Sequence, residues 1–311
     1  MRKLVVEPSC GALDAIDRFE GKAPSAGDYD EMLESPVDVR DSSGNIICIV
    51  VPNAAKSAKV AYEALRTAVQ PTRNRQVAAN GETSYIRKKD GTMSNTTQLP
   101  THLAPMSSIV GYYDRYARTP FARACRWNRD NRDEWQAIQP FIHSVSECFR
   151  EHAPIYWNRQ KAVADQIPKD WIIGDTPFST ITVNKTFSIH YHRDRGDLHE
   201  GLGVMAHMSI GSYGGGELII PRYRIGLKLK HRDVVLFDVH QVHGVTPLTG
   251  AWGRFVRMTC VFYLREDLLR CGNIDYEAKR AKIARSLGRL YDPEEIELAK
   301  IRKQRALSCA E

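Results

Sequence analysis

The amino-acid sequence predicts an α+β fold in which a β-barrel or jelly-roll core is flanked by helices. Residues 178–268 contain short β-rich runs separated by Gly, Pro and Asp, and half a dozen or more strands at this spacing are typical of barrels and jelly rolls. Apolar residues at helical spacing precede this stretch, and a charged helical tail follows it. The chain has 311 residues, which is enough for one large core, so we expect a single domain over residues 1–311.

The core strands are predicted from runs of β-branched and aromatic residues that are bounded by turn residues. We expect them at 181–189, 203–210, 217–220, 225–229, 234–239 and 257–263.

The N-terminal part, residues 1–110, is expected to contain strands, a helix and loops. A strand is predicted at 46–51, where an apolar run follows the turn sequence Ser-Ser-Gly-Asn. A helix is predicted at 58–69, because apolar residues recur there at helical spacing. Residues 71–107 are polar and rich in turn signals, which indicates long loops.

Residues 111–177 are expected to form a helical region, rich in basic and aromatic side chains, that supports the core. Within it, apolar residues at roughly helical intervals predict a helix over 133–151. Residues 275–311 are expected to form C-terminal helices. The segment Asp292-Pro293-Glu294-Glu295 has the composition of a helix start, with an N-cap Asp, a Pro in the first turn and a Glu three residues after the cap.

Composition and charge exclude several classes of protein. No apolar run reaches the length of about 18 residues that a membrane span needs, so we expect no membrane partner. The N-terminus has too short an apolar stretch for a secretory signal, so we expect a cytoplasmic or nuclear-type intracellular protein that is not secreted. The seven cysteines are scattered singly, which argues against a disulfide framework or a structural zinc site. The formal net charge of +7 permits a polyanionic partner without establishing one.

Two segments about fifty residues apart carry residues that can bind a metal ion together. A His-x-Asp pair, His192 and Asp194, with a distant His supplies two imidazoles and one carboxylate, the facial set of non-haem Fe(II) oxygenases. Because residues two apart on a strand face the same side, His192 and Asp194 can reach one ion. The spacing leaves the choice of histidines open, since His190 shares this strand face and His240 competes with His243.

A basic residue on the strand after the second His could form a salt bridge with the remote carboxylate of 2-oxoglutarate. Arg257 lies 14 positions beyond His243, and Arg254 competes with it at this step.

The amino-acid sequences of these segments resemble those of the JBP/TET family of DNA-base dioxygenases. The resemblance is clear over residues 178–268 and extends faintly upstream to Ser108-Ile109-Val110-Gly111-Tyr112-Tyr113-Asp114-Arg115. It implies a single catalytic domain with a double-stranded β-helix (jelly-roll or cupin-like) core and Fe(II), 2-oxoglutarate and O2 as cofactors. The matching runs are VNKTF at 183–187, HRDRGD at 192–197, GGGEL at 214–218, DVHQVHGVTPL at 238–248 and RMTCVFY at 257–263.

By this resemblance His192, Asp194 and His243 match the iron ligands and therefore the catalytic centre. His243 is preferred because the family places its distal ligand just before a Thr-Pro-Leu sequence. His190 and His240 then become histidines that pack beside the site.

The resemblance also assigns the cosubstrate residues. Arg257 matches the clamp for the 2-oxoglutarate carboxylate, and the hydroxyl of Thr259 lies two residues on. Asn184 is a further cosubstrate candidate, and the alternative is a strand-end amide that satisfies backbone groups.

A separate argument for nucleic acid comes from residues 112–132, where arginines alternate with aromatic residues in a pattern that suits phosphate contacts and base stacking. The alternative is a solvated face whose arginines pair with acidic neighbours such as Asp130, Asp133 and Glu134. Residues 222–232 form a second basic stretch. The six arginines of the first stretch are Arg115, Arg118, Arg123, Arg126, Arg129 and Arg132.

The family resemblance implies that Asp197, Tyr263 and Arg265 read a base of DNA. A methyl group inside a duplex is out of reach of a pocket, so the 5-methylpyrimidine must be flipped out or single-stranded. Tyr263 would stack on the base. Asp197 can accept from the exocyclic amine of cytosine, and Arg265 can donate to cytosine N3 and O2. A structural interpretation makes Asp197 a turn cap and pairs Arg265 with Glu266 or Asp267 on the surface.

The expected function is oxidation of 5-methylcytosine in DNA to 5-hydroxymethylcytosine, with formyl and carboxyl as further products, by a monomeric enzyme. TET-type members usually have His where this chain has Arg265, so a JBP-like thymine hydroxylase that forms 5-hydroxymethyluracil is the alternative. A protein or small-molecule hydroxylase with the same iron site also fits the iron-binding pattern. A non-catalytic nucleic-acid-binding module is a further candidate, against which the intact set of iron and cosubstrate residues argues.

Overall fold

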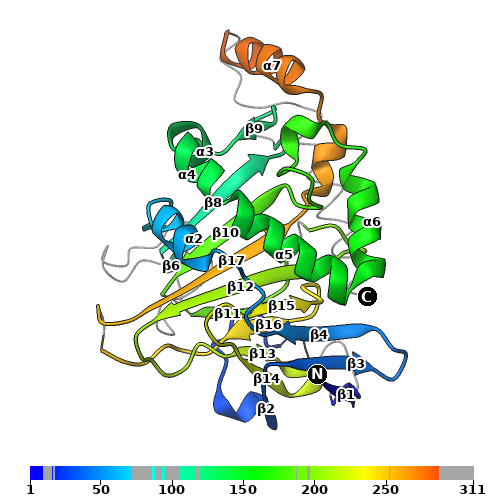
Figure 1. The fold of residues 1–311 in the computed structure, drawn as a ribbon, viewed down its shortest axis with the longest axis vertical. Coiled ribbons are helices and arrows are strands. Elements are labelled where there is room, and N and C mark those ends of the chain that lie inside the picture. The colour runs from blue at the N-terminus through cyan, green and yellow to red at the C-terminus, as the bar shows by residue number, and fades with distance from the viewer. Residues whose placement is uncertain are drawn as a thin grey trace.

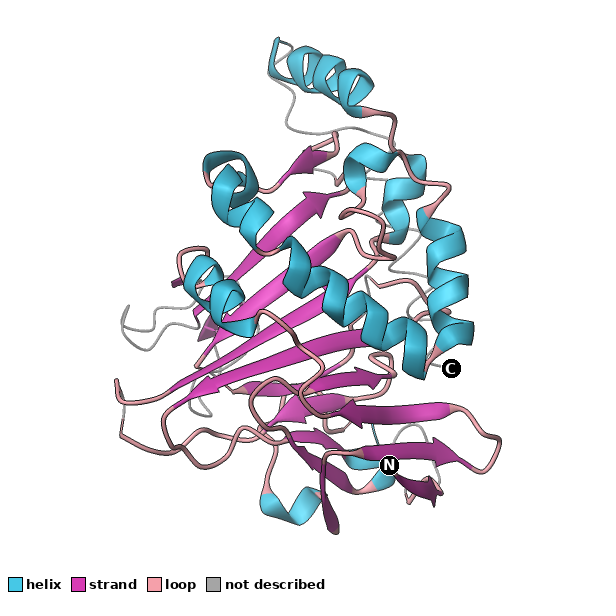
Figure 2. Cartoon of the chain, in the orientation of Figure 1, coloured by secondary structure: helices cyan, strands magenta, loops and turns pink. Residues whose placement is uncertain are grey.

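The fold of the chain is known from a computed structural model, which describes residues 1–9, 16, 18–71, 86–87, 93–94, 106–116, 119–186, 188–194, 197–251 and 253–286. Two β-sheets lie at its centre, and helices cover one face of the larger sheet (Figure 1, Figure 2). No helix among these residues is both long and apolar enough to cross a bilayer.

The larger sheet is antiparallel except for its β1–β3 pair, and several strands that are far apart in the sequence lie next to each other in it. In spatial order its strands are β1 (Arg2–Val6), β3 (Val37–Asp41), β4 (Ile46–Val51), β15 (Val234–Phe237), β12 (Gly203–Ile210), β17 (Val256–Tyr263), β10 (Thr180–Lys185), β8 (Met106–Tyr113) and β5 (Gln70–Pro71), with β9 (Arg123–Ala124) paired to β8.

The smaller sheet packs against the larger one through an apolar cluster to which both sheets contribute. Its spatial order is β11 (Ile189–His192), β16 (His243–Val245), β13 (Leu218–Ile220), β14 (Ile225–Lys228) and β2 (Glu31–Glu34), and a separate pair consists of β6 (Ile86–Arg87) and β7 (Met93–Ser94). Two facing, largely antiparallel sheets with flanking helices agree with the predicted jelly-roll core.

The helices bury the outer face of the larger sheet. Phe141 of α5 packs against Phe262 of β17 at a ring-centroid distance of 5.8 Å, and α5 lies across the strands in Figure 1. The helices are α2 (Ala58–Leu65), α3 (Arg126–Asp130), α4 (Arg132–Ala137), α5 (Gln139–His152), α6 (Pro154–Ala164) and α7 (Ile274–Ser286), with 3-10 turns η1 (Ala26–Asp28), η4 (Lys169–Trp171), η5 (Pro221–Tyr223) and η6 (Glu266–Arg270).

Strand alternation gives the larger sheet two different faces. On β17, Met258, Cys260 and Phe262 join the apolar cluster beneath the helices. Between them, Thr259 and Val261 point toward the smaller sheet, where a cavity lies. The same strand therefore supplies packing on one face and functional groups on the other.

Most predicted elements are confirmed, including the strand at 46–51 and the core strands from 203 onward. The predicted helix at 133–151 is divided at Ile138 into α4 and α5, and Pro140 stands in the first turn of α5. The predicted strand at 181–189 is divided into β10 and the start of β11. The helix start at Asp292 lies outside the described residues.

Strand β8 was not predicted, because Ser107, Ser108 and Gly111 interrupt its apolar pattern. It lies between β10 and β5, so partners on both sides hydrogen-bond it. Gly111 has φ +99°, and a Cβ there would come within 2.5 Å of the Ser179 carbonyl oxygen. Glycine is required at this position by both the backbone conformation and the close approach of β10.

Candidate metal centre and substrate cavity

A cavity of about 940 Å³ opens between the two sheets. This volume is in the range of sites that hold small molecules. Its apolar lining includes Met205, Leu218, Phe237, Val245 and Val261, and its polar side chains come mainly from β8, β10, β11, β16 and β17.

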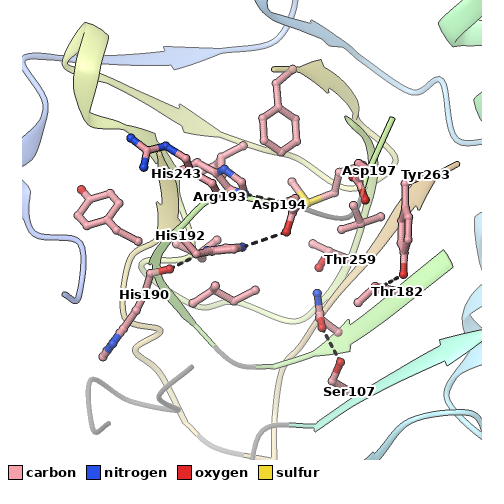
Figure 3. A pocket seen from close by; sticks show the side chains of 18 of the residues that line it. Ser107, Thr182, His190, His192, Arg193, Asp194, Asp197, His243, Thr259 and Tyr263 are labelled. Atoms are coloured by element: carbon pink, nitrogen blue, oxygen red, sulfur yellow. Dashed lines mark hydrogen bonds and ion pairs between the residues drawn. The ribbon is translucent and has the colours of Figure 1, made fainter. Parts of the chain in front are cut away.

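Three metal-binding side chains converge in this cavity. His192 ends β11, His243 begins β16, and the two residues face each other across the antiparallel pair. The carboxylate of Asp194 lies 3.6 Å from His192 Nε2 and 3.8 Å from His243 Nε2 (Figure 3). One ligand atom from each of the three residues lies within 4.8 Å of the others, so all three can bind one ion.

Backbone carbonyls orient both imidazoles for metal binding. Nδ1 of His192 lies 2.8 Å from the carbonyl oxygen of His190, and Nδ1 of His243 lies 2.9 Å from that of Gln241. A carbonyl only accepts, so each Nδ1 donates, and Nε2 keeps its lone pair on the side of Asp194. Burial and then the neighbouring His192 hold the pKa of His243 below its ordinary value, so the ring is neutral, as a ligand must be. The three residues fit a divalent iron site.

The competing histidines lie outside this cluster. The ring of His190 is directed away from Asp194 in Figure 3. His240 contacts Asp238 instead, with 3.3 Å between Nδ1 and Oδ1.

A buried guanidinium lies in the same cavity. Arg257 of β17 is 2% exposed, and its Nη2 donates to the Gly216 carbonyl oxygen at 3.0 Å. Its Nε has no hydrogen-bond partner among the described residues. A buried cation with an unused donor fits a small carboxylate ligand. Arg254, the other candidate, is exposed in the turn before β17.

Two further cosubstrate candidates face each other across neighbouring strands. Asn184 of β10 pairs in register with Thr259 of β17, and both side chains are buried and line the cavity. Ser107 donates its hydroxyl hydrogen to Asn184 Oδ1 at 2.8 Å, so the amide oxygen already has one partner.

The three predicted base-reading residues also line the cavity. Arg265 donates from Nη1 to Asp114 Oδ1 at 3.2 Å and from Nη2 to the Tyr263 hydroxyl at 3.2 Å. The Tyr263 hydroxyl also lies 3.3 Å from Thr182 Oγ1. Burial and the nearby Asp194 raise the pKa of Asp197 well above its ordinary value, so this carboxyl can be protonated and donate as well as accept.

Sequence reasoning assigned no role in the cavity to two residues that line it or to one that pairs with a lining residue. Tyr113 and Glu20 line the cavity, and Asp114 pairs with Arg265. Glu20 forms a 2.6 Å ion pair with Arg193, the residue between two candidate metal ligands. Tyr113 and Asp114 belong to the faintly matching segment 108–115 and to the arginine- and aromatic-rich segment 112–132, which were their signals. Glu20 had no signal in the sequence, because backbone hydrogen bonds between residues 21–22 and Tyr191 bring it to the cavity.

The arginine-rich segment 112–132 has mixed roles. Arg115 forms a buried ion pair with Glu277 of α7, and Arg126 pairs with Asp130 at 3.0 Å. Arg129 and Arg132 are not buried, and Arg118 lies outside the described residues. In the second basic stretch, Arg224 pairs with Asp30 and Lys230 with Glu34. Acidic partners therefore account for several of these cations.

Comparison with protein families gives a match over residues 108–266 to Tet_JBP, described as the oxygenase domain of the 2OGFeDO superfamily. The chain is 32% identical over 237 residues to thymine dioxygenase JBP1 of Leishmania infantum, covering 74% of this chain and 26% of that protein. It is 29% identical over 253 residues to thymine dioxygenase JBP1 of Trypanosoma brucei brucei, covering 79% and 27%. The chain thus spans about a quarter of the length of these relatives.

A solved structure, NgTET1 in complex with 5mC DNA, superimposes with a TM-score of 0.51 over 82% of this chain and 90% of that one. The two sequences are 12% identical, so this likeness shows a shared fold alone.

Proposed function

The chain belongs to the Tet_JBP family of 2OGFeDO oxygenase domains, and from this membership we propose that it hydroxylates the 5-methyl group of thymine in DNA. The product is 5-hydroxymethyluracil. One observation carries the proposal: a His-Asp-His cluster and a buried arginine share one cavity. The named relatives of the chain are thymine dioxygenases.

Thymine is preferred over 5-methylcytosine because of the relatives. The relatives at 29–32% identity carry the name thymine dioxygenase, whereas the likeness to NgTET1 is one of fold. The donor at Arg265 and the oxygen of Asp197 can pair with either base, because thymine offers two carbonyl acceptors and one N3–H donor, and cytosine offers acceptors at N3 and O2 and an amine donor. The sequence alone favours 5-methylcytosine with thymine second, and the relatives reverse that order.

The site residues divide the work. We assign His192, Asp194 and His243 to Fe(II), and Arg257 with Thr259 to the remote carboxylate of 2-oxoglutarate. When bound, iron and 2-oxoglutarate supply the oxidation, in which one atom of O2 enters succinate, CO2 leaves, and the other atom enters the methyl group. The apolar cavity wall excludes water around the methyl group.

The base must leave its stack to enter this cavity, so the substrate is a flipped-out or single-stranded thymine in DNA. Tyr263 offers the aromatic face on which it stacks. The side chains that line the cavity come from positions between 20 and 265, which supports one catalytic domain over the chain.

Nucleoside mass spectrometry tests the proposal. The protein, with Fe(II) and 2-oxoglutarate, is incubated with DNA that contains both thymine and 5-methylcytosine, and Asp194→Ala serves as the control. We expect 5-hydroxymethyldeoxyuridine with the native chain only. Exclusive formation of 5-hydroxymethylcytosine would reverse the base assignment, and succinate production that ignores DNA would indicate a protein or small-molecule substrate.

A further inference from the structure

A series of alternating tyrosine and arginine side chains runs from the cavity to the protein surface. The guanidinium of Arg265 lies over the rings of Tyr263 and Tyr113, with Cζ 5.4 and 5.1 Å from their centroids. Arg123 lies over Tyr113 and Tyr116 at 4.6 and 4.9 Å. We call Tyr263, Arg265, Tyr113, Arg123 and Tyr116 the Tyr–Arg series.

The two ends of the Tyr–Arg series have different environments. Tyr263 is 9% exposed and lines the cavity, whereas Tyr116 is 42% exposed. The Tyr116 ring thus keeps part of its area open to solvent. The series therefore connects the proposed base site with an aromatic face that is open to solvent.

Backbone pairing and a hydrogen bond hold the outer end in place. Tyr113 of β8 pairs in register with Arg123 of β9, and Tyr116 forms a β-bridge with Thr119. Arg123 Nη2 donates to the Tyr116 hydroxyl at 2.8 Å. A ring fixed in this way loses little conformational entropy when a ligand stacks on it.

Two exposed arginines follow β9 along the chain. Arg126, whose side chain is 86% exposed, pairs with Asp130, and Arg129 on α3 is exposed as well. Aromatic faces beside arginines bind unstacked nucleotides, because bases stack on the rings and phosphates pair with the cations. A protein or lipid partner would not need the continuity with the base cavity.

We propose that Tyr116, at the outer end of the Tyr–Arg series, stacks on a DNA base next to the flipped thymine, and that Arg123 holds its ring in position. This proposal rests on the proposed function, since flipping one nucleotide breaks the stacking of its neighbours. The exposed ring replaces part of the stacking that the neighbouring base loses.

Anaerobic DNA binding by the full chain with Fe(II) and 2-oxoglutarate tests this surface. The probe is a fluorescent duplex with one mismatched thymine, and the dissociation constant is measured across several salt concentrations. We expect Tyr116→Leu to raise it about tenfold, in the range measured for loss of one base–aromatic stack. The salt dependence should not change, because no phosphate contact is removed.

Two variants serve as comparisons. Tyr116→Phe loses the hydrogen bond from Arg123 but keeps the aromatic ring and its contact with the Arg123 guanidinium, so it should bind within about twofold of the native chain. Tyr276 is a matched control, because it is 52% exposed and also lies beside an arginine, Arg115, but outside the series. Tyr276→Leu should leave the dissociation constant unchanged. The proposal is overturned if Tyr116→Leu binds like the native chain, or if Tyr116→Phe binds as weakly as Tyr116→Leu.

Thymine oxidation, measured by mass spectrometry in parallel, separates this proposal from the proposed function. If the native chain forms the thymine product and Tyr116→Leu binds DNA as tightly as the native chain, only the proposal for Tyr116 is overturned. If Tyr116→Leu binds DNA about tenfold more weakly and the native chain forms no thymine product, the proposal for Tyr116 is supported and the proposed function is overturned. A native chain that binds no DNA overturns both.

Discussion

Replacing Arg257 with Met separates the cosubstrate role of this arginine from its role in stability. Methionine keeps an apolar side chain of similar length in the cavity wall and removes the charge. Loss of one partner of a buried, hydrogen-bonded charge pair costs about 2 kcal/mol or more. Because 1.4 kcal/mol is a factor of about ten, the KM for 2-oxoglutarate should rise at least about 30-fold. The KM for DNA should change little, since Tyr263 and Arg265 lie at and beyond the far end of β17, and Asp197 forms a β-bridge with Arg265.

The same substitution should not destabilise the fold. Burial lowers the pKa of Arg257, which means that the folded protein disfavours its charge. Removal of that charge relieves the desolvation penalty, while the Gly216 carbonyl loses one hydrogen bond worth about 1 kcal/mol. The Tm should therefore remain equal or rise.

Arg254→Met is the matched control, because this arginine is exposed three residues earlier. Initial rates of succinate formation against 2-oxoglutarate concentration, with calorimetric Tm, measure both effects. The reasoning is refuted if Arg254→Met raises the KM for 2-oxoglutarate and Arg257→Met does not.

Other substitutions test the remaining parts of the site. His192→Ala or Asp194→Ala should abolish succinate formation and leave the DNA dissociation constant within about threefold, since neither side chain is assigned to DNA; a large loss of DNA affinity would contradict this. Asp197→Ala should weaken the preference for thymine over 5-methylcytosine in competition assays, and an unchanged rate and preference would remove Asp197 from base reading. Glu277→Gln should lower the free energy of unfolding by about 3 kcal/mol in urea titrations at neutral pH, because it breaks a buried pair with Arg115. Burial opposes ionisation of Glu277, but hydrogen bonds from Arg115, Ala122 and Gly272 hold its pKa below the ordinary value. The stabilisation by ionised Glu277 is thus complete above about pH 4.3, the pKa of this residue in the unfolded chain, and is lost as the pH falls through the lower pKa of the folded state. The assignment would be contradicted if the free energy of unfolding decreased with acidification as steeply in Glu277→Gln as in the native chain.

The parts of the fold that could be predicted are those with strong local patterns. Strands 203–210 and 257–263 combine apolar alternation with bounding turns, and both form near those limits. Strand β8 could not be predicted in this way, because pairing with β10 and β5 stabilises a segment that contains Ser107, Ser108 and Gly111.

In the candidate site, too, local sequence patterns predicted some residues and not others. The His-x-Asp spacing predicted that His192 and Asp194 lie together, although Asp194 follows the end of β11 and strand alternation therefore does not explain their approach. The choice of His243 over His240 depended on the family resemblance. Arg115 was expected to contact nucleic acid, yet it pairs with Glu277, which lies 162 positions away in the chain. Contacts at that separation arise from tertiary packing and leave no local pattern in the sequence.

The central claim is that this cavity transfers oxygen from O2 to the methyl group of thymine in DNA. The most direct measurement is nucleoside mass spectrometry after turnover under labelled oxygen gas with Fe(II) and 2-oxoglutarate. We predict 5-hydroxymethyldeoxyuridine whose hydroxyl oxygen carries the label, and no labelled nucleoside with Asp194→Ala. The claim would be contradicted if all of the thymine remained unmodified and 2-oxoglutarate were consumed at the same rate with and without DNA.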